Sequence, residues 1–361
     1  MTRPAYPGAV ELRLVRLPTL EGLASGHDRA PGTHRELVIV RVSDTDGHVG
    51  WGECSALNRP TYTAEWARDA YEFLTVAPLS EPIPWSRPMA AAGIEMALTD
   101  LRLRSAGQSL AASLGVMVTS IPAGAAVGLA PLTELVERVD ALVADGFGRI
   151  KLKIEPGHDL LAVGAIRERH PHVDLQVDAN GSYAPKHQHV LHALAAMGVT
   201  AIEQPFAVDD LASARALVEA GAVVIGDEAI GNLDDAKHLH GAGALNALSL
   251  KPSRVGGLEA AVQIHDWAVA NDVGLAAGGM LECGLGRHSL AAFAGLRGFT
   301  ITGDLSPARR WLAEDPWPDL VLERGADQIA RIMVPTGPGV APPPDLDLLD
   351  HFTMANCSRP W

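Results

Sequence analysis

Short apolar segments alternate with longer segments of helical periodicity from about residue 121 to residue 303. The short segments are typical of buried strands, and the intervening ones place apolar residues at helical spacing. The predicted strands are IPAGAAVGL, RIKLKI, DLQVDA, TAIEQ, AVVIGD, ALSLK, VGLAAG and FTITG, and the predicted helices cover residues 133–146, 159–170, 189–198, 211–221, 233–243 and 258–272. Strands that alternate with helices indicate parallel βαβ units, and eight of them predict a closed α/β barrel.

The residues before this region follow a different pattern. The segments AVELRLVRL and ELVIVRVSDTDGHVGWGEC alternate apolar and polar residues around a turn at residues 44–47, as paired antiparallel strands do. Helical spacing follows over 64–73 and 90–106. The segment Gly22–Arg35 is rich in Gly, Pro and His and has no periodicity, which predicts a loop long enough to cover a site. The pattern therefore indicates a separate α+β module.

Composition narrows the classes of partner. The chain has 361 residues, and 29 Lys+Arg against 43 Asp+Glu give a net charge of −14, which disfavours nucleic acid as a partner. No run of 18 or more apolar residues indicates a membrane span, and no apolar leader is evident, so we expect a cytoplasmic protein without a membrane partner. Three cysteines without zinc-type spacing fit a reducing compartment. The sequence leaves self-association into a homo-oligomer open.

Charged residues stand at the ends of five successive predicted strands. They are Lys153, Asp178, Glu203, Asp227 and Lys251, at intervals of 25, 25, 24 and 24 residues, each the length of one βα unit. The carboxyl ends of barrel strands lie on one face, so these side chains should converge at one mouth. A single strand-end carboxylate can instead cap the following helix. Five charged strand ends in succession favour a shared site.

Three converging carboxylates repel one another unless a cation holds them, and an all-oxygen ligand set suits Mg²⁺, with Mn²⁺ as a substitute. Lys153 and Lys251 should face each other on opposite sides of that metal. This arrangement fits abstraction of a proton α to a carboxylate through an enediolate. Return of the proton on the other face gives racemisation, and loss of a β-substituent gives elimination.

Two other functional classes are weighed against this hypothesis. A Schiff-base aldolase barrel uses one strand-end lysine to attack a carbonyl, but it leaves the three carboxylates unexplained. A non-catalytic ligand-binding barrel would not need both lysines and all three carboxylates. The sequence therefore favours a metal-dependent enzyme.

The order of motifs KLK, VDAN, IEQPF, GDE, SLKPSRVGG and AAGGMLECGLGR resembles the enolase superfamily, muconate-cycloisomerase-like branch, over nearly the whole chain. The segment Gly278–Arg287 resembles the seventh-strand motif of the subfamily of o-succinylbenzoate synthases and N-succinylamino acid racemases. The resemblance implies an α/β fold, a modified (β/α)7β TIM barrel with an N-terminal α+β capping domain. The expected divisions are a capping domain over 1–120, the barrel over 121–325 and a segment over 326–361 that returns to the capping domain.

The resemblance also implies roles for individual residues. It implies Asp178, Glu203 and Asp227 as metal ligands and Lys153 and Lys251 as the acid/base pair. The substrate-binding residues that it implies are Lys151, Asn180, Arg254, Gly279, Met280 and Glu282, and those expected to orient the ligands are Gln204 and Glu228. Trp51–Cys54, followed by Pro60, Tyr62 and Glu65, resembles a second capping loop.

The implied activity is Mg²⁺-dependent chemistry on a small-molecule carboxylate. Dehydration by an o-succinylbenzoate synthase, racemisation of N-succinyl or other N-acylamino acids, or both, are expected, with muconate cycloisomerase-like or dipeptide epimerase activity as the alternative. Arg254, three residues after Lys251, favours racemisation, as racemase-like relatives tend to carry Arg there. Two departures leave specificity open. The predicted loop Gly22–Arg35 lacks the Phe-Thr-Ser-Phe-Gly-like stretch common in relatives, and Ala126 stands where relatives often place a small hydroxyl residue.

Overall fold

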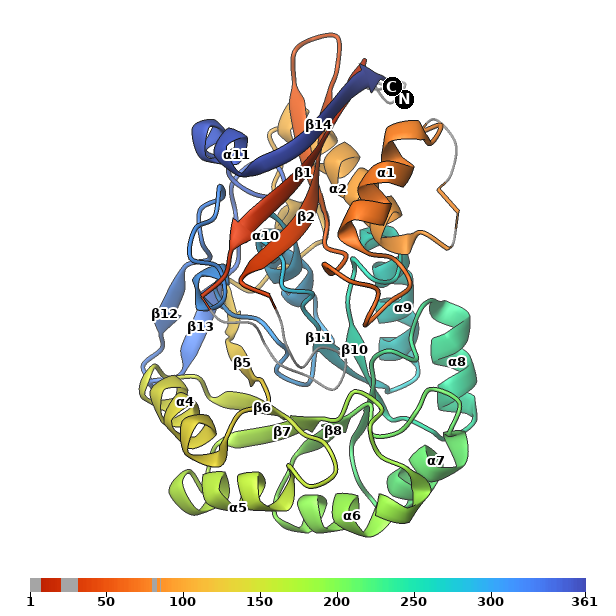
Figure 1. Cartoon of the computed structure of the whole chain (residues 1–361), viewed down its shortest axis with the longest axis vertical. Helices are drawn as coiled ribbons and strands as arrows, with labels where there is room; N and C mark the ends of the chain where they lie inside the picture. Colours follow the sequence, from red (N-terminus) through yellow and green to blue (C-terminus); the bar gives the residue numbers. More distant parts are fainter. Residues whose placement is uncertain (1–7, 21–31, 80–82, 85) are drawn as a thin grey trace.

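The computed structural model describes residues 8–20, 32–79, 83–84 and 86–361. A capping domain built around an antiparallel sheet lies over an α/β barrel (Figure 1). The capping elements are β1 (Ala9–Pro18), β2 (His34–Ser43), β3 (Val49–Cys54), α1 (Ala67–Val76), α2 (Pro88–Ser105), α11 (Leu346–Phe352) and β14 (Thr353–Pro360). The sheet order is β14-β1-β2-β3, and Ala9 of β1 lies opposite Pro360 of β14.

Close backbone packing joins the capping sheet to its main helix. A Cβ atom at Gly50 would lie 2.2 Å from the Ala97 carbonyl oxygen, and one at Gly52 would lie 2.0 Å from the Gly93 carbonyl oxygen. Real Cβ atoms do not approach so closely, so only glycine allows α2 to lie this near to β3. These glycines therefore set the position of α2 in the capping domain.

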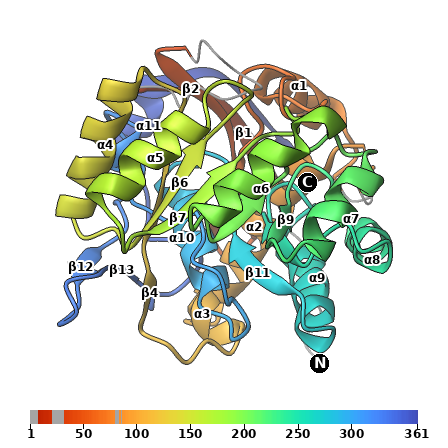
Figure 2. The ribbon, with the colours of Figure 1, turned by 90° about the horizontal axis from the view of Figure 1, so that it is seen from below.

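The barrel contains a seven-stranded parallel sheet in the order β11-β10-β9-β8-β7-β6-β5. Its strands are β5 (Gly124–Val127), β6 (Arg149–Lys153), β7 (Asp174–Asp178), β8 (Ala201–Glu203), β9 (Val224–Gly226), β10 (Ala247–Leu250) and β11 (Gly274–Ala277). The helices are α4 (Leu132–Ala144), α5 (Leu160–Arg169), α6 (Gln188–Ala196), α7 (Leu211–Glu219), α8 (Leu233–Gly241), α9 (Leu258–Ala270) and α10 (Gly284–Ala294). Figure 2 shows α4 to α7 on the outer side of the sheet that contains β6 and β7. Successive strands are neighbours in the sheet, as the strand–helix alternation predicts.

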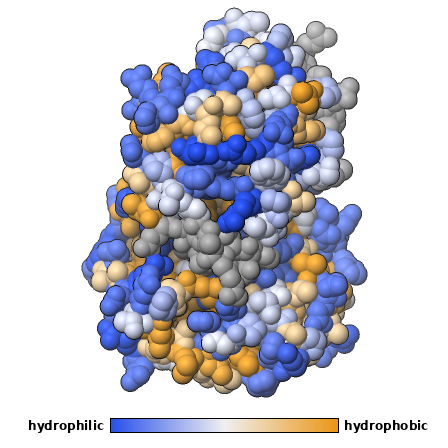
Figure 3. Space-filling model, viewed as in Figure 1, coloured by the Kyte–Doolittle hydropathy of each residue, from blue (hydrophilic) through white to orange (hydrophobic). Residues whose placement is uncertain are grey.

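Smaller elements complete the chain. They are α3 (Leu110–Ser113), β4 (Ser120–Pro122), β12 (Leu322–Arg324), β13 (Ala330–Met333) and the short helices η1 (Pro185–His187) and η2 (Ala308–Arg310). Strands β12, β13 and β4 form a third, antiparallel sheet. In the view of Figure 3, hydrophilic side chains cover much of both domains and hydrophobic ones lie between them in separate groups. No helix among the described residues is long and apolar enough to cross a membrane.

The eighth predicted strand, FTITG, is not a strand, and this part of the prediction is wrong. Residues 299–303 are irregular, yet they occupy the gap between β11 and β5. Ile301 N–H donates to the Leu275 carbonyl (3.0 Å), and on the other side Gly124 N–H donates to the Leu305 carbonyl (3.1 Å). A Cβ at Gly303 would lie 2.2 Å from the Ala277 carbonyl oxygen. The segment thus closes the barrel by close backbone contact instead of a regular hydrogen-bond ladder.

Other predicted boundaries also change. The segment IPAGAAVGL contains two strands, because β4 pairs with β13 and only β5 enters the barrel. The predicted loop Gly22–Arg35 overlaps β2, which begins at His34, while residues 21–31 lie outside the described part of the chain. Helix α10 was not predicted, since its first turn contains two glycines, which disfavour helix.

Candidate active site

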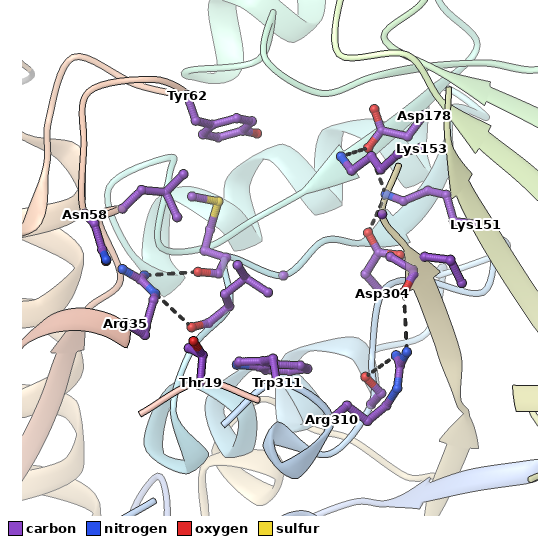
Figure 4. A pocket seen from close by; sticks show the side chains of 18 of the residues that line it. Thr19, Arg35, Asn58, Tyr62, Lys151, Lys153, Asp178, Asp304, Arg310 and Trp311 are labelled. Carbon is purple, nitrogen blue, oxygen red and sulfur yellow. Dashed lines mark hydrogen bonds and ion pairs between the residues drawn. The ribbon is translucent and has the colours of Figure 1, made fainter. Parts of the chain in front are cut away.

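Strand register brings the predicted site residues together. Lys153 of β6 lies opposite Asp178 of β7, and Asp178 lies opposite Glu203 of β8. Asp227 follows β9 directly and Lys251 follows β10. One oxygen from each of the three carboxylates lies within 4.8 Å of the others, and all three residues are buried. The structure therefore brings the five strand-end residues to one mouth of the barrel, and Figure 4 shows Lys153 beside Asp178.

The two candidate acid/base lysines have different partners. Lys153 Nζ donates to Asp178 Oδ2 (2.6 Å) and to Asn180 Oδ1 (2.9 Å), both in the barrel. Lys251 Nζ donates to Asp227 Oδ2 (2.8 Å) and to the hydroxyl of Tyr62 (2.8 Å), which comes from the capping domain. The cap thus reaches one lysine of the pair directly.

Lys151 lies on the same side of β6 as Lys153 and is almost fully buried. Its Nζ donates to Glu203 Oε2 (2.7 Å), lies 3.4 Å from Asp178 Oδ2 and pairs with Asp304. Burial alone would lower the pKa of Lys151, but the carboxylates of Asp304, Glu203 and Asp178 raise it well above its usual value. Lys151 is therefore a fixed positive charge at the site.

The carboxylate group is chemically suited to a hard divalent cation. Glu203 Oε1 is buried and has no hydrogen-bond partner among the described residues. Burial, together with repulsion from Asp178 and Asp227, raises the pKa of Glu203 to about 7, although the positive charge of Lys151 acts in the opposite direction. Burial would also raise the pKa of Asp178, but the positive charges of Lys153 and Lys151 have the larger effect and lower that pKa below its usual value. A divalent ion would relieve the repulsion and satisfy the orphaned oxygen, so the residues present fit such an ion.

Two polar residues orient this group. Gln204 has a left-handed backbone (φ 36°), and its Oε1 accepts from the backbone N–H groups of Asp227 (3.0 Å) and Ala229 (3.2 Å). Asn180, also left-handed (φ 44°), bridges Lys153 and Glu228, since its Nδ2 donates to Glu228 Oε1 (2.8 Å). Gln204 thus contacts the backbone of Asp227, as a residue that orients a ligand would, whereas Asn180, expected to bind substrate, contacts Lys153 and Glu228.

A cavity of about 820 Å³ lies between the capping domain and the barrel mouth. Its lining includes the three lysines, Asp178, Asn180, Gly279 and Met280 from the barrel, and Arg35, Asn58 and Tyr62 from the cap. Figure 4 shows side chains from both domains around the same space. Gly278 leaves room for one of the lysines, because a Cβ there would lie 2.6 Å from Lys251 Cγ. The cavity can therefore hold a small-molecule substrate against the lysines.

Two residues expected to contact substrate lie outside this lining. Arg254 is buried behind Asp227, where Nη1 contacts Asp227 and the Tyr62 hydroxyl (2.5 Å) and Nη2 donates to the Ser249 carbonyl (3.0 Å). Glu282 accepts from Met280 N–H (2.8 Å) and pairs with Arg287 (3.1 Å). In these positions Arg254 contacts Asp227, and Glu282 contacts the backbone of Met280, which lines the cavity.

Sequence reasoning missed three residues of the site. Asp304 pairs with Lys151 and with the buried Arg149, and Arg310 lines the cavity. Asp304 directly follows the segment predicted as the eighth strand, so the rule that strand-end charges converge would have found it. Nothing in the sequence pattern marks Arg149 or Arg310.

The chain is similar to known proteins over most of its length. Residues 134–347 match the family described as Enolase C-terminal domain-like. The chain is 36% identical to o-succinylbenzoate synthase of Bacillus subtilis (strain 168) over 82% of this chain and 85% of that protein. It is 35% identical to N-succinylamino acid racemase of Amycolatopsis sp over 96% of this chain and 97% of that one. A solved structure of an enolase superfamily member from Listeria innocua superposes with a TM-score of 0.89 at 29% identity, covering 98% of each chain.

The chain belongs to the enolase superfamily and has the fold expected of it, a modified TIM barrel beneath an α+β capping domain. It is an enzyme of that superfamily.

Proposed function

We propose that the protein abstracts the proton α to a carboxylate in an Mg²⁺-dependent reaction, as an o-succinylbenzoate synthase, an N-acylamino acid racemase, or both. The relatives bearing these names are similar over most of the chain. The observation that carries the proposal is that Lys153 lies on β6 and Lys251 directly after β10, with the three carboxylates on or directly after the strands between them.

Asp178, Glu203 and Asp227 would hold the Mg²⁺ ion, which stabilises negative charge on a bound substrate carboxylate and so acidifies its α-carbon. Lys151 adds a fixed positive charge for that carboxylate. One of the two flanking lysines takes the α-proton. In racemisation the other lysine delivers a proton to the opposite face, whereas elimination needs only one of them.

The experiment is a rate assay with Mg²⁺ on two compounds, the cyclohexadiene precursor of o-succinylbenzoate and an N-succinylamino acid. Removal of divalent ions by chelator should abolish turnover of either compound, and Mg²⁺ or Mn²⁺ should restore it. Full turnover by metal-free protein contradicts the metal assignment. A borohydride-trapped adduct on Lys153 or Lys251 would instead indicate a Schiff-base enzyme.

We also propose that the protein acts in the cytoplasm. Cys54 and Cys283 are buried free thiols, and Cys357 is free as well. Unpaired thiols suit a reducing compartment. Loss of activity on incubation in a glutathione buffer poised at a cytosolic potential would count against this assignment.

A further inference from the structure

Arg310 differs from the other cations that line the cavity. Most of those cations pair with a carboxylate: Arg16 and Arg68 with Glu36, Lys153 with Asp178, Lys251 with Asp227, Lys151 with Glu203 and Asp304, and Arg287 with Glu282. No carboxylate of the described residues forms an ion pair with Arg310. Arg35 also lacks one, but its guanidinium donates to five backbone carbonyl groups at 2.6 to 3.2 Å.

The contacts that Arg310 does make are weak. Nη1 lies 3.3 Å from Ser306 Oγ and Nη2 lies 3.4 Å from the Ala126 carbonyl oxygen, both longer than an ordinary hydrogen bond. The guanidinium carbon stands 5.4 Å from the centre of the Phe147 ring. The guanidinium N–H groups of Arg310 therefore pack beside Phe147 and form only long contacts with protein acceptors.

The environment of Arg310 favours an anion. Burial and repulsion from Arg287 lower the pKa of Arg310 to about 10, against attraction from the carboxylates of Asp304 and Asp145, so the group is still charged at neutral pH. The Arg310 side chain is half-buried, and neither Asp304 nor Asp145 forms an ion pair with it, so a bound carboxylate would offset the cost of its partial removal from water. The planar guanidinium can hold both carboxylate oxygens at once.

Arg310 lies apart from the charges that would bind the reacting carboxylate. Figure 4 shows Arg310 on the wall below Asp304, with Lys151 and Lys153 further up that wall. The neighbouring lining residues Ala126, Val127 and Leu142 are apolar. The cavity therefore offers one cationic site at the metal ligands, a second at Arg310 and apolar surface beside it.

The geometry points to Arg310 as the residue that binds a second carboxylate of the substrate, at the end remote from the reacting α-carbon. This inference rests on the proposed function and deepens it. The protein then prefers a dianionic N-acylamino acid, whose acyl chain ends in a carboxylate, over a monoanionic one of the same length. Ala126, which has no side-chain donor, leaves this role to the guanidinium beside it.

The test compares two ligands and two variants. N-succinyl-L-phenylalanine and N-butanoyl-L-phenylalanine have acyl chains of the same length, but only the first ends in a carboxylate. Arg310→Met removes the proposed contact, and Arg309→Met removes a neighbouring positive charge that is exposed and pairs with Asp319 (2.7 Å). Dissociation constants with Mg²⁺ present are measured by calorimetry, and KM and kcat by α-proton exchange.

For Arg310→Met we expect the Kd and KM of the N-succinyl compound to rise roughly 10- to 100-fold, the usual range for loss of a hydrogen-bonded charge pair. Its kcat, and both constants for the N-butanoyl compound, should change by less than about threefold, and Arg309→Met should match the wild type. Equal losses for both compounds, or no loss for either, overturn the role of Arg310.

Calorimetry separates this failure from failure of the proposed function. If the wild type binds the N-succinyl compound more tightly than the N-butanoyl one and Arg310→Met removes the difference, Arg310 binds the second carboxylate even if no α-proton exchange occurs. If exchange occurs but the wild type does not distinguish the two compounds, the proposed function stands and the role of Arg310 is wrong. If the wild type neither exchanges protons nor distinguishes the compounds, both are wrong.

Discussion

Tyr62 is expected to control one face of the active site. Its hydroxyl accepts a hydrogen bond from Lys251 (2.8 Å) and donates to Asp227 Oδ2 (2.9 Å), whereas the hydrogen bonds of Lys153 go to barrel residues. Tyr62→Phe removes the hydroxyl and keeps the ring, whose centre lies 4.7 Å from Lys251 Nζ. A hydrogen bond to a charged group contributes about 1.5–3 kcal/mol, so its loss should slow proton transfer by Lys251 roughly 10- to 100-fold.

The assay is solvent-deuterium exchange at the α-carbon of each enantiomer of an N-succinylamino acid, followed by NMR with Mg²⁺ saturating. The enantiomer served by Lys251 is the one whose exchange Lys251→Ala abolishes. Tyr62→Phe should slow exchange of that enantiomer and change the other by less than about threefold. Tyr71→Phe removes a tyrosine hydroxyl on α1 of the capping domain and serves as the control. Equal slowing of both enantiomers would refute the reasoning, because it would show that Tyr62 acts on the metal ligands and not on one lysine.

Three further predictions concern the lysines, the metal and the capping domain. Lys153→Ala and Lys251→Ala should each lower the rate of racemisation about 10²-fold or more. Each variant should still exchange the α-proton of one enantiomer. Exchange of both enantiomers by either variant would show that the lysines do not serve opposite faces. Because the pKa of Glu203 is raised to about 7 without metal, Mg²⁺ must displace a proton below that pH, so its apparent affinity, measured by calorimetry, should fall by up to about tenfold per pH unit from pH 7 to pH 5.5. A pH-independent affinity over that range would contradict the assignment. Gly52→Ala places a Cβ 2.0 Å from the Gly93 carbonyl oxygen and should lower the free energy of unfolding by about 1–3 kcal/mol or more in urea titrations. The control Gly241→Ala, with nothing within 4 Å of its new Cβ, should not destabilise, and equal stability of the two variants would show that α2 can move away.

The barrel and its strand-end residues could be predicted because both depend on local periodicity. One βα unit takes 24 or 25 residues here, and the parallel register then places Lys153, Asp178 and Glu203 side by side. The irregular closing segment could not be predicted, because its apolar residues have the composition of a strand. The close approach of Gly303 to Ala277 has no counterpart in that composition.

The sequence pattern could not predict contacts between elements that are distant in the chain. The hydrogen bond between Tyr62 and Lys251 depends on how the capping domain packs on the barrel. No spacing along the chain indicates that these two residues are close. Arg254 was expected to contact substrate because of the resemblance of the KPSR segment to racemase-like relatives. The turn after β10, in which Arg254 N–H donates to the Lys251 carbonyl (3.0 Å), instead directs its side chain to Asp227.

The pairing of β14 with β1 bears on the order in which the molecule is made. Ala9 and Pro360 are partners in one sheet although the whole barrel lies between them in the chain. On the ribosome, β1 emerges early and has only β2 beside it until β14 has been synthesised. The barrel can therefore assemble before its cap is complete, and the two halves of the cavity are joined in their final form only when translation has passed β14.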